Sequence, residues 1–292
     1  MRDVSFLLIP LLVFIMAVPT KIMAAQPTVN LRTISSFAVL AGTTITNTGP
    51  TTINGDAGGN VGLHPGTDFP GRTDVTLSGA VHLADAVALQ AKNDLISAFD
   101  DAAGRTPATR IPAELGGTTL KPGVYDSEAG SFTITGTLTL DAQGDPDGVF
   151  IFKMASSLIT ASGSNVNLIN SARYCRIFWQ VGSSATLGTN SHFVGHIFAL
   201  TSIAAQTGAT VQGQLLARNG AVTLDSNTIT NGICATPTLT PAATSRTTVP
   251  GELADTSDLT SWKSMAIGIS LLVIGSGALL LRRDFKRTHP QK

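Results

Sequence analysis

The chain has 292 residues, with 19 basic and 19 acidic side chains and a formal net charge of zero. Seven basic and two acidic residues lie in residues 1–25 and 282–292, which leaves 12 basic and 17 acidic residues between them. A mildly acidic chain without a basic stripe excludes nucleic acid as the expected partner. Residues 155–234 are almost uncharged, because their only charged side chains are Arg173, Arg176, Arg218 and Asp225.

The N-terminus is typical of a secretory signal peptide. Arg2 precedes an apolar run from Phe6 to Val18, and the small pair Ala24 and Ala25 supplies a cleavage site. These three features, in this order, predict that residues 1–25 direct export and are not part of the fold. The remainder up to residue 234 is long enough for one domain with a substantial core.

A helix is predicted within residues 81–104, ending near Gly104. Its apolar residues recur with helical spacing along one side: Ala84, Val87, Ala91, Leu95, Ala98 and Phe99. The charged residues expected on the opposite side are Asp85, Lys92, Asp94, Asp100 and Asp101. The helix should therefore lie along the surface of the domain, with one side against it.

The second half of the domain contains a repeat. Four stretches, 149–166, 175–193, 195–211 and 213–229, open with an apolar run, continue through small residues and close on Val166, Phe193, Val211 and Ile229. A period near 20 residues predicts a β-solenoid in which each repeat forms one coil. Residues 131–141 add a strand with alternating threonines, and residues 37–55 resemble a further coil.

Cys175 and Cys234 are the only cysteines of the chain. Two cysteines in an exported protein are most simply a disulfide, which would tie the end of the domain back to an inner coil. A metal site is not expected, because no further His or Cys lies at ligand spacing.

The C-terminal segments predict an anchor. Residues 235–263 are rich in Thr, Pro, Ala and Ser and should form an extended stalk. Residues 264–281 should span the membrane, since no charge occurs between Met265 and Leu281. The basic residues of 282–292 should then lie in the cytoplasm. The domain would be displayed outside the cell.

A sorting signal is a further expectation within the stalk. The stretch "LADTS" (253–257), with Leu253, Ala254 and Thr256, resembles the Leu-Ala-x-Thr-Gly signal of sortase substrates. Ser257 stands where that signal has glycine, so anchoring by the membrane span alone is the alternative to covalent attachment.

The domain closely resembles a known family over residues 30–234. The resemblance lies in "FAVLAGTTITNTGPTTINGDAG", "LKPGVYDSEAGSFTITGTLTLDAQGDPDGVFIFKM" and the run from "FWQVGSSATLGTNSHF" to "LDSNTIT". These resemble the ice-binding (antifreeze) proteins of cold-adapted bacteria, fungi and algae. The resemblance implies an irregular right-handed β-helix of triangular section, with a long helix along one side and the N-terminal coil next to the C-terminal coils.

The resemblance also implies one flat face that binds ice through Thr-(Ala/Gly)-x-(Thr/Asn) patterns. Two patterns match fully and one nearly, and aligned positions add two further residues. The predicted ice-binding residues are Thr48, Thr51, Ser162, Asn165, Thr189, Thr207, Thr210 and Thr228. His192 and Asp225 interrupt the two aligned columns.

The spacing within this pattern leaves a second column open. Thr207 and Thr210 are three residues apart, so an ideal strand cannot point both to the same side. Either the pattern crosses a bend or only one of its columns lies on the active face. The alternative column is Thr160, Thr186, Ala204 and Thr223.

Catalytic residues, cofactors and metal ligands are not predicted. Asp141, Asp145 and Asp147 lie in a Gly- and Pro-rich stretch that is typical of a turn. His192 and His196 are four residues apart but lack the intervening Glu of a zinc helix. We therefore expect a monomeric, surface-anchored ice-binding protein that is not an enzyme. The alternatives are a surface adhesin that binds polysaccharide or another cell, and a β-helix glycan-processing enzyme.

Overall fold

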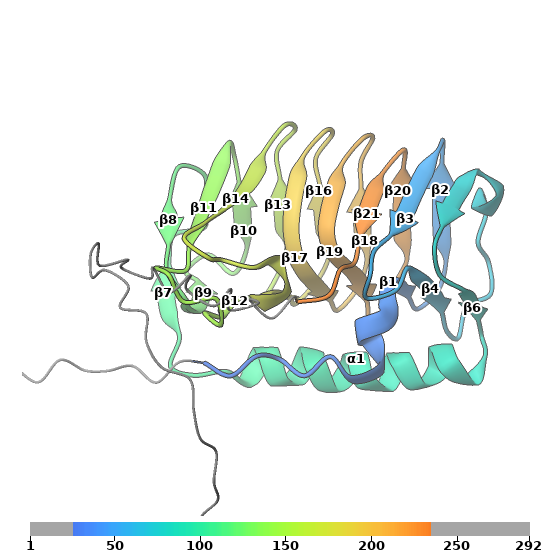
Figure 1. Cartoon of the computed structure of the whole chain (residues 1–292), viewed down its shortest axis with the longest axis horizontal. Coiled ribbons are helices and arrows are strands. Elements are labelled where there is room, and N and C mark those ends of the chain that lie inside the picture. The colour runs from blue at the N-terminus through green and yellow to red at the C-terminus, as the bar shows by residue number, and fades with distance from the viewer. Residues whose placement is uncertain (1–25, 235–292) are drawn as a thin grey trace, which may run out of the picture. The chain divides into compact units, whose positions relative to one another are not determined.

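The computed structural model describes residues 26–234, which form a β-helix with one long helix alongside (Figure 1). Its strands pair in parallel and stack along one axis into three faces. Besides the helix α1 (Ala86–Gly104), the described part has three short 3-10 helices, Arg32–Ser36, Arg72–Asp74 and Tyr174–Arg176. The predicted β-helix with a flanking helix is confirmed.

The first face lies against α1 and is called the helix-side face. Its strands, in spatial order, are β7 (Thr109–Ile111), β9 (Gly123–Ser127), β12 (Phe150–Met154), β15 (Ile177–Val181), the second halves of β17 (His192–Ala199) and β19 (Thr210–Ala217), β1 (Phe37–Ala41), β4 (Asn60–Leu63) and β6 (Val81–Leu83).

The second face is a separate sheet, called the six-stranded face. It consists of β10 (Phe132–Ile134), β13 (Leu158–Thr160), β16 (Ala185–Leu187), β18 (Ile203–Ala205), β20 (Val222–Asp225) and β2 (Ile45–Thr48).

The third face is called the Thr/Asn face, after its outward side chains. It consists of β8 (Thr119–Leu120), β11 (Thr137–Asp141), β14 (Asn165–Ile169), the first halves of β17 and β19, β21 (Thr228–Thr230), β3 (Thr51–Asn54) and β5 (Val75–Leu77).

The core runs through the centre of the coils. The four closing residues of the sequence repeat point into it and are at most 4% exposed, which confirms the repeat: Val166, Phe193, Val211 and Ile229. Stacked rings form part of this core, in which the Phe152 and Trp179 centroids lie 3.9 Å apart. Inward side chains of this size exclude water and fix the register of each coil on the next.

The N-terminal coil lies beside the C-terminal coils, as expected. β2 pairs with β20, β3 with β21, and β1 with β19. Figure 1 shows these blue strands next to the orange ones. Strand β21 therefore lies between two neighbours although it is the last strand of the described chain.

The prediction of one continuous strand over residues 131–141 is wrong. Gly136 has a φ of 82°, which is a left-handed conformation that turns the chain at this point. Residues before the turn form β10 on the six-stranded face, and residues after it form β11 on the Thr/Asn face. The alternating threonines of this stretch thus belong to two different surfaces.

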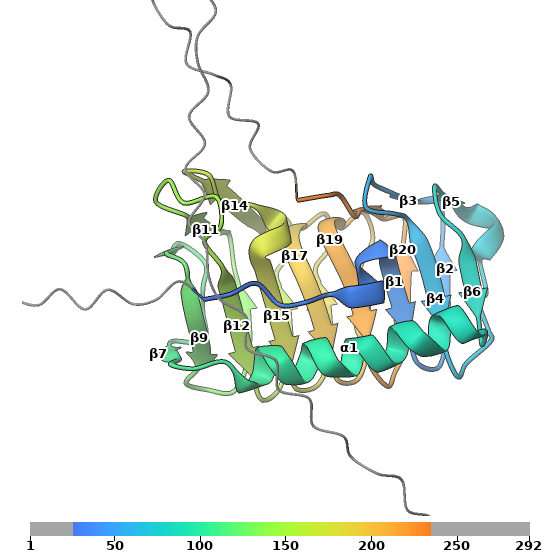
Figure 2. The ribbon, with the colours of Figure 1, turned by 60° about the horizontal axis from the view of Figure 1, so that its bottom comes forward.

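The helix α1 lies along the helix-side face, across several strands (Figure 2). Asp85 caps its first turn by accepting a hydrogen bond from the Ala88 backbone N–H. Between α1 and this face, apolar side chains of both form a second core, which includes Leu95, Phe99, Phe178, Phe198 and Leu216.

The prediction of which helix residues face solvent is partly wrong. Val87 is 48% exposed, whereas Lys92 and Asp94 are only 7% and 4% exposed. The Lys92 ammonium donates to the Ala217 and Arg218 carbonyl oxygens, and Asp94 accepts from the Thr33 hydroxyl at 2.6 Å. These two side chains can be buried because polar groups of the domain satisfy their hydrogen bonds.

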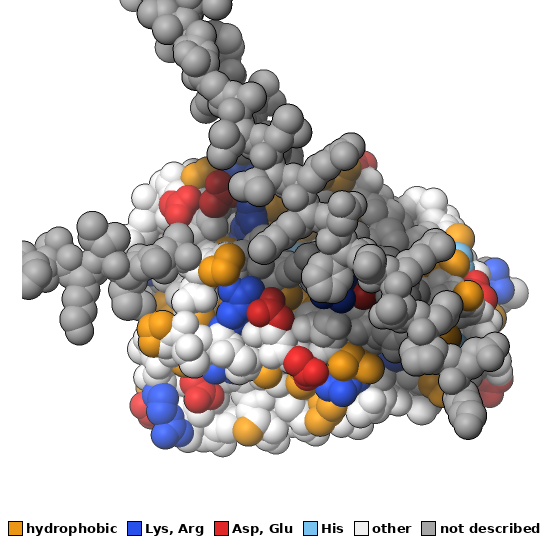
Figure 3. Space-filling model, turned by 90° about the horizontal axis from the view of Figure 1, so that it is seen from below, with side chains coloured by type: hydrophobic (Ala, Val, Ile, Leu, Met, Phe, Trp, Pro, Cys, Tyr) orange, Lys and Arg blue, Asp and Glu red, His pale blue; other side chains and the backbone are white. Residues whose placement is uncertain are grey.

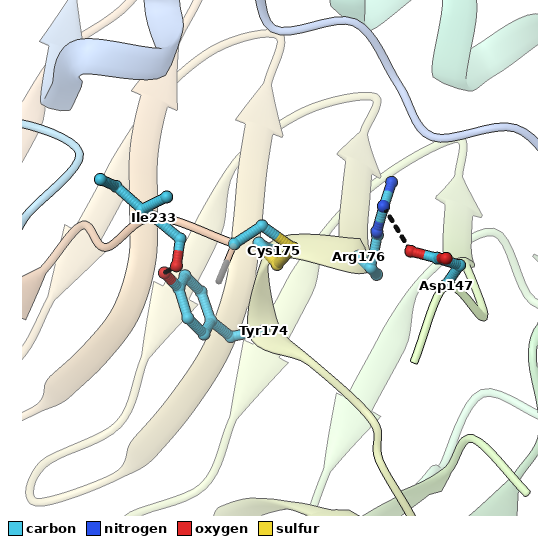
Figure 4. Close-up of a disulfide and its surroundings, with 6 residues drawn as sticks. Asp147, Tyr174, Cys175, Arg176 and Ile233 are labelled. Atoms are coloured by element: carbon cyan, nitrogen blue, oxygen red, sulfur yellow. Dashed lines mark hydrogen bonds and ion pairs between the residues drawn. A yellow bond between two sulfur atoms is a disulfide. The ribbon is translucent and has the colours of Figure 1, made fainter. Parts of the chain in front are cut away.

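The predicted disulfide joins Cys175 to Cys234 (Figure 4). The neighbouring Tyr174 hydroxyl donates to the Ile233 carbonyl oxygen at 3.0 Å. Arg176, on the other side, forms an ion pair with Asp147 at 2.7 Å. The disulfide and the Tyr174 hydrogen bond fasten the end of the domain to the start of β15, and the ion pair ties that start to the segment between β11 and β12.

The signal peptide (1–25), the stalk with its LADTS stretch and the predicted membrane span lie outside the described residues. Within residues 26–234, no helix combines the length and apolar character that crossing a membrane requires.

Candidate ligand-binding face

Two ranks of outward side chains run along the Thr/Asn face. In the first rank, strand register aligns Thr137, Asn165, His192, Thr210, Thr228, Thr52 and Thr76. In the second rank, two positions further along each strand, lie Thr119, Thr139, Asn167, Gln212, Thr230 and Asn54, whereas Val194, which pairs with Gln212, is buried in the core. Because neighbouring strands are about 4.8 Å apart, side chains in a rank repeat at that interval.

A third rank follows the corner between the six-stranded face and the Thr/Asn face. It contains Ser162, Thr189, Thr207, Asp225 and Thr48, as backbone hydrogen bonds between successive coils show. The next residue of each coil has a positive φ of 53–73°: Gly163, Asn190, Gly208, Ser226 and Gly49. One left-handed residue per coil thus turns all five coils at the same corner.

This corner explains how Thr207 and Thr210 face the same way despite their spacing. Gly208 turns the chain, and Ala209 points inward and is fully buried. Asn227, in the same inward position one coil on, donates its amide N–H to the Gln206 and Ala209 carbonyl oxygens at 2.9 and 3.0 Å. The motif crosses a bend, which is one of the two possibilities that the sequence left open.

The N-terminal coil differs from the predicted alignment. Thr51 is 1% exposed, and its hydroxyl oxygen accepts from the Asn227 backbone N–H inside the corner. Thr52, which is exposed, pairs with Thr228 and occupies the first rank instead. The coil has one more residue at this corner than its neighbour, which shifts the pattern by one position. Thr51 therefore cannot contact a ligand on the face.

The alternative column also differs from the prediction. Thr160 is 4% exposed and points inward, where its hydroxyl accepts from the Gly188 backbone N–H at 2.9 Å. Thr186 and Thr223 do point outward, and their rank on the six-stranded face is Thr133, Ile159, Thr186, Ala204, Thr223 and Thr46.

The six-stranded face is less uniform than the Thr/Asn face. Ile159, which is 47% exposed, and Ala204 place apolar groups among its threonines. At one end the Glu114 carboxylate accepts from the hydroxyls of Thr133 and Thr135 at 2.8 and 3.0 Å. Burial acts to raise the pKa of Glu114, but these bonds and two from backbone N–H groups outweigh it and lower that pKa.

Hydrogen bonds connect neighbouring members of the ranks. The Thr207 hydroxyl donates to the Asp225 carboxylate, and His192 Nδ1 lies 2.8 Å from the Thr210 hydroxyl oxygen. At the far side Thr230 donates to Asn54 at 2.9 Å. Side chains held in this way lose rotamer freedom before any ligand arrives.

The ranks carry almost no charge. Of the residues that compose them, only Asp225 is an acid and none is Lys or Arg. The other charged side chains of the described domain lie outside these ranks, and Figure 3 shows several of them on the side that carries α1 (Figure 3).

The face also has a shallow hollow of about 260 Å³. It lies between the first two ranks, along His192, Thr210, Gln212 and Thr228.

Within residues 26–234, no three His, Cys, Asp or Glu side chains lie together as possible ligands of a metal ion. Asp141 accepts from the Gln143 backbone and the Asn170 amide, which lowers its pKa, the Asn170 bond contributing most. Asp147 pairs with Arg176. His192 and His196 lie on opposite sides of a bend at Gly195, where φ is 111°.

The sequence predicts Asn165, Thr210 and Thr228 of the first rank, with His192 as an interruption, and every member of the corner rank except Asp225, but it misses the whole second rank. It also misses Thr52, Thr76 and Thr137. The alternation of each with a buried partner, such as Ile53 after Thr52 and Leu138 after Thr137, is the signal that identifies them. This alternation assigns a residue to the correct face only when the positions of the corners between the faces are known.

Comparisons with known proteins agree with this geometry. A family model described as ice-binding-like matches residues 39–230. An ice-binding protein of Nostoc sp. is 42% identical over 71% of this chain and 76% of its own.

A solved ice-binding protein from an Antarctic biological consortium is 43% identical, with a TM-score of 0.69, over 71% of this chain and 93% of its own. One from the Antarctic ascomycete Antarctomyces psychrotrophicus is 41% identical, with a TM-score of 0.65, over 70% of this chain and 98% of its own. These relatives are named for binding ice and not for an enzymatic activity, which agrees with the expectation of a non-enzyme. The chain belongs to the ice-binding-like family.

Proposed function

We propose that residues 26–234 bind ice as a monomer through the Thr/Asn face, with the corner, first and second ranks as the contact surface. The observation that carries the proposal is the first rank, in which seven successive coils present five threonines, one asparagine and one histidine. The names of the relatives support the same ligand.

The chemistry of the ranks supports this role. Threonine offers a hydroxyl and a methyl on a β-branched side chain with restricted χ1, so its groups keep fixed positions. Repetition along parallel strands places them at regular intervals on a surface whose backbone is held by sheet hydrogen bonds. Such an array orders water in a regular layer, whereas a charge orients water around itself.

The Thr/Asn face is preferred over the six-stranded face for two reasons. Its first rank has no apolar member, whereas Ile159 and Ala204 interrupt the rank of the six-stranded face. It also has two further ranks beside the first. The helix-side face is covered by α1 and is not available to a flat ligand.

We also propose that the protein acts at the cell surface. The support is the sequence alone: an export signal in residues 1–25, a stalk over 235–263, an apolar span over 264–281 and a basic end. Residues 253–257 would serve a sortase if Ser257 is accepted in place of glycine. A tethered domain of this kind attaches cells to ice or shapes ice close to them.

The test is thermal hysteresis with microscopy of ice crystals on residues 26–234. Solved relatives correspond to this part over more than nine-tenths of their length, so we expect it to fold alone. Circular dichroism checks folding, and an inert protein at equal concentration is the control. Faceted crystals and a hysteresis gap support the proposal. Ice growth equal to that of the control, from a folded sample, overturns it and turns attention to polysaccharide binding.

A further inference from the structure

His192 is the one titratable side chain of the first rank. It lies on β17 between Asn165 of β14 and Thr210 of β19, and its side chain is exposed. The buried Phe193 follows it and fixes the direction in which it points. His192 is therefore held near the middle of the rank, where a change in its charge affects the surface on both sides.

The hydrogen bond between His192 and Thr210 depends on the state of the imidazole. Nδ1 lies 2.8 Å from the Thr210 hydroxyl oxygen. With Nδ1 unprotonated, the hydroxyl donates to the ring. An imidazolium has a proton on both nitrogens, so Nδ1 must then donate and the hydroxyl must accept. The Thr210 proton would have to turn elsewhere, and the Ser191 carbonyl oxygen at 3.5 Å is the next acceptor.

No neighbouring charge compensates an imidazolium at this place. The flanking strands β14 and β19 contain no Asp, Glu, Lys or Arg, and neither does the next strand, β21. The other titratable group of β17 is His196, which is 2% exposed and lies beyond the bend. In the ranks themselves, the one acid is Asp225, in the corner rank two coils further on.

We propose that His192 is a positioning residue of the ice-binding face, and that its protonation weakens ice binding. This inference rests on the proposed function. Neutral His192, with Nδ1 unprotonated, accepts a hydrogen bond from the Thr210 hydroxyl and leaves the first rank uncharged. Protonation reverses that hydrogen bond and places a full charge in the rank. The charge holds its own hydration shell, which competes with the ordered layer that the threonines support.

The consequence is ice binding that depends on pH, because the charge of an imidazole changes when it is protonated. Activity should be highest when the imidazole is neutral and should fall as the solution is acidified. A purely structural histidine would change stability with pH but would not change hysteresis of the folded protein.

The test measures hysteresis of residues 26–234 at pH 8 and pH 5, with near-UV circular dichroism at both values to show that the fold persists. The variant is His192→Asn, because asparagine already occupies this rank at Asn165 and stays neutral. The matched control is His64→Asn, since His64 is partly exposed but lies outside the ranks.

The expected result is a several-fold loss of hysteresis at pH 5 in the unmodified protein and in His64→Asn, and no loss in His192→Asn. Equal hysteresis of the unmodified protein at both pH values overturns the inference but leaves the proposed function intact. The same loss in His192→Asn as in the unmodified protein also overturns it. No hysteresis at either pH, from folded protein, removes the proposed function and this inference together.

Discussion

The carboxylate of Asp225 accepts a hydrogen bond from the hydroxyl of Thr207 on the preceding coil. The same carboxylate accepts from the Ser226 hydroxyl at 3.1 Å. Asp225 thereby fixes two neighbouring hydroxyls at the corner, but it also brings the single acidic charge of the ranks. The fixed positions of these hydroxyls favour an ordered water layer on the surface, whereas the negative charge opposes it. A substitution that removes only the charge separates the two effects.

Asp225→Asn should increase the thermal hysteresis of the domain. The amide oxygen can still accept from Thr207, while the negative charge is removed, so the corner rank keeps its geometry and becomes neutral. Thermal hysteresis at equal concentration is the measurement, with the melting temperature as the control for folding. Lower hysteresis in a variant of unchanged stability would show that the ranks need the carboxylate itself.

Gly208→Ala and Gly163→Ala should destabilise the domain by similar amounts. Both glycines occupy the corner column with positive φ, 73° and 67°. An alanine in this conformation costs about 1–2 kcal/mol at either site. A Cβ at Gly163 would meet nothing within 4 Å, and a Cβ at Gly208 would lie 2.3 Å from Oδ1 of Asn190, an exposed side chain that can turn aside. Urea denaturation measures both, and unchanged stability in either variant would contradict this account of the corner.

Stability should fall as the solution is acidified below pH 6.5, because of His196. Burial lowers the pKa of His196 from 6.5 to about 4, so the unfolded chain binds a proton in this range and the folded chain does not. The lost free energy of unfolding is about 2 kcal/mol between pH 6.5 and 5, at about 1.4 kcal/mol per pH unit.

Urea denaturation across this range tests the role of His196. In a His196→Phe variant this part of the pH dependence should be absent, since phenylalanine does not titrate and the site already contacts the Phe178 ring. A variant that loses as much stability on acidification as the unmodified domain would show that other groups are responsible.

Replacing both cysteines with serine should weaken the fold but not the ice-binding face. The disulfide closes a loop between residues 59 apart in sequence, and removing such a constraint typically costs about 2–4 kcal/mol. Neither cysteine belongs to the ranks. Melting temperature should therefore fall while hysteresis near 0 °C is retained. Loss of hysteresis in a double variant that is still folded would connect this end of the domain to the face.

Much of the fold could be predicted from the sequence because the repeat is regular. The apolar residues that close each repeat, such as Phe193 and Val211, mark the core directly. The partnership of the N-terminal coil with the C-terminal ones was expected from the resemblance alone. No local pattern in residues 37–55 specifies that β2 pairs with β20.

The site was less predictable, because a strand's outward side depends on where the coil turns. Thr51 and Thr160 look like members of a threonine column in sequence, yet each is buried, and its hydroxyl oxygen accepts a hydrogen bond from a backbone N–H. One additional residue before Thr52 is sufficient to move Thr51 inward. Lys92 and Asp94 were misplaced for a similar reason, since their partners lie on segments distant in sequence.

The most direct test of the central claim compares two matched substitutions, Thr228→Tyr and Thr223→Tyr, in residues 26–234. Both threonines are exposed and point outward, but Thr228 lies in the first rank of the Thr/Asn face and Thr223 in the rank of the six-stranded face. A tyrosine at either site holds a flat ligand away from that face. The account predicts that Thr228→Tyr loses most of its thermal hysteresis and that Thr223→Tyr keeps it. Loss in Thr223→Tyr with retention in Thr228→Tyr would place ice binding on the six-stranded face and contradict the account.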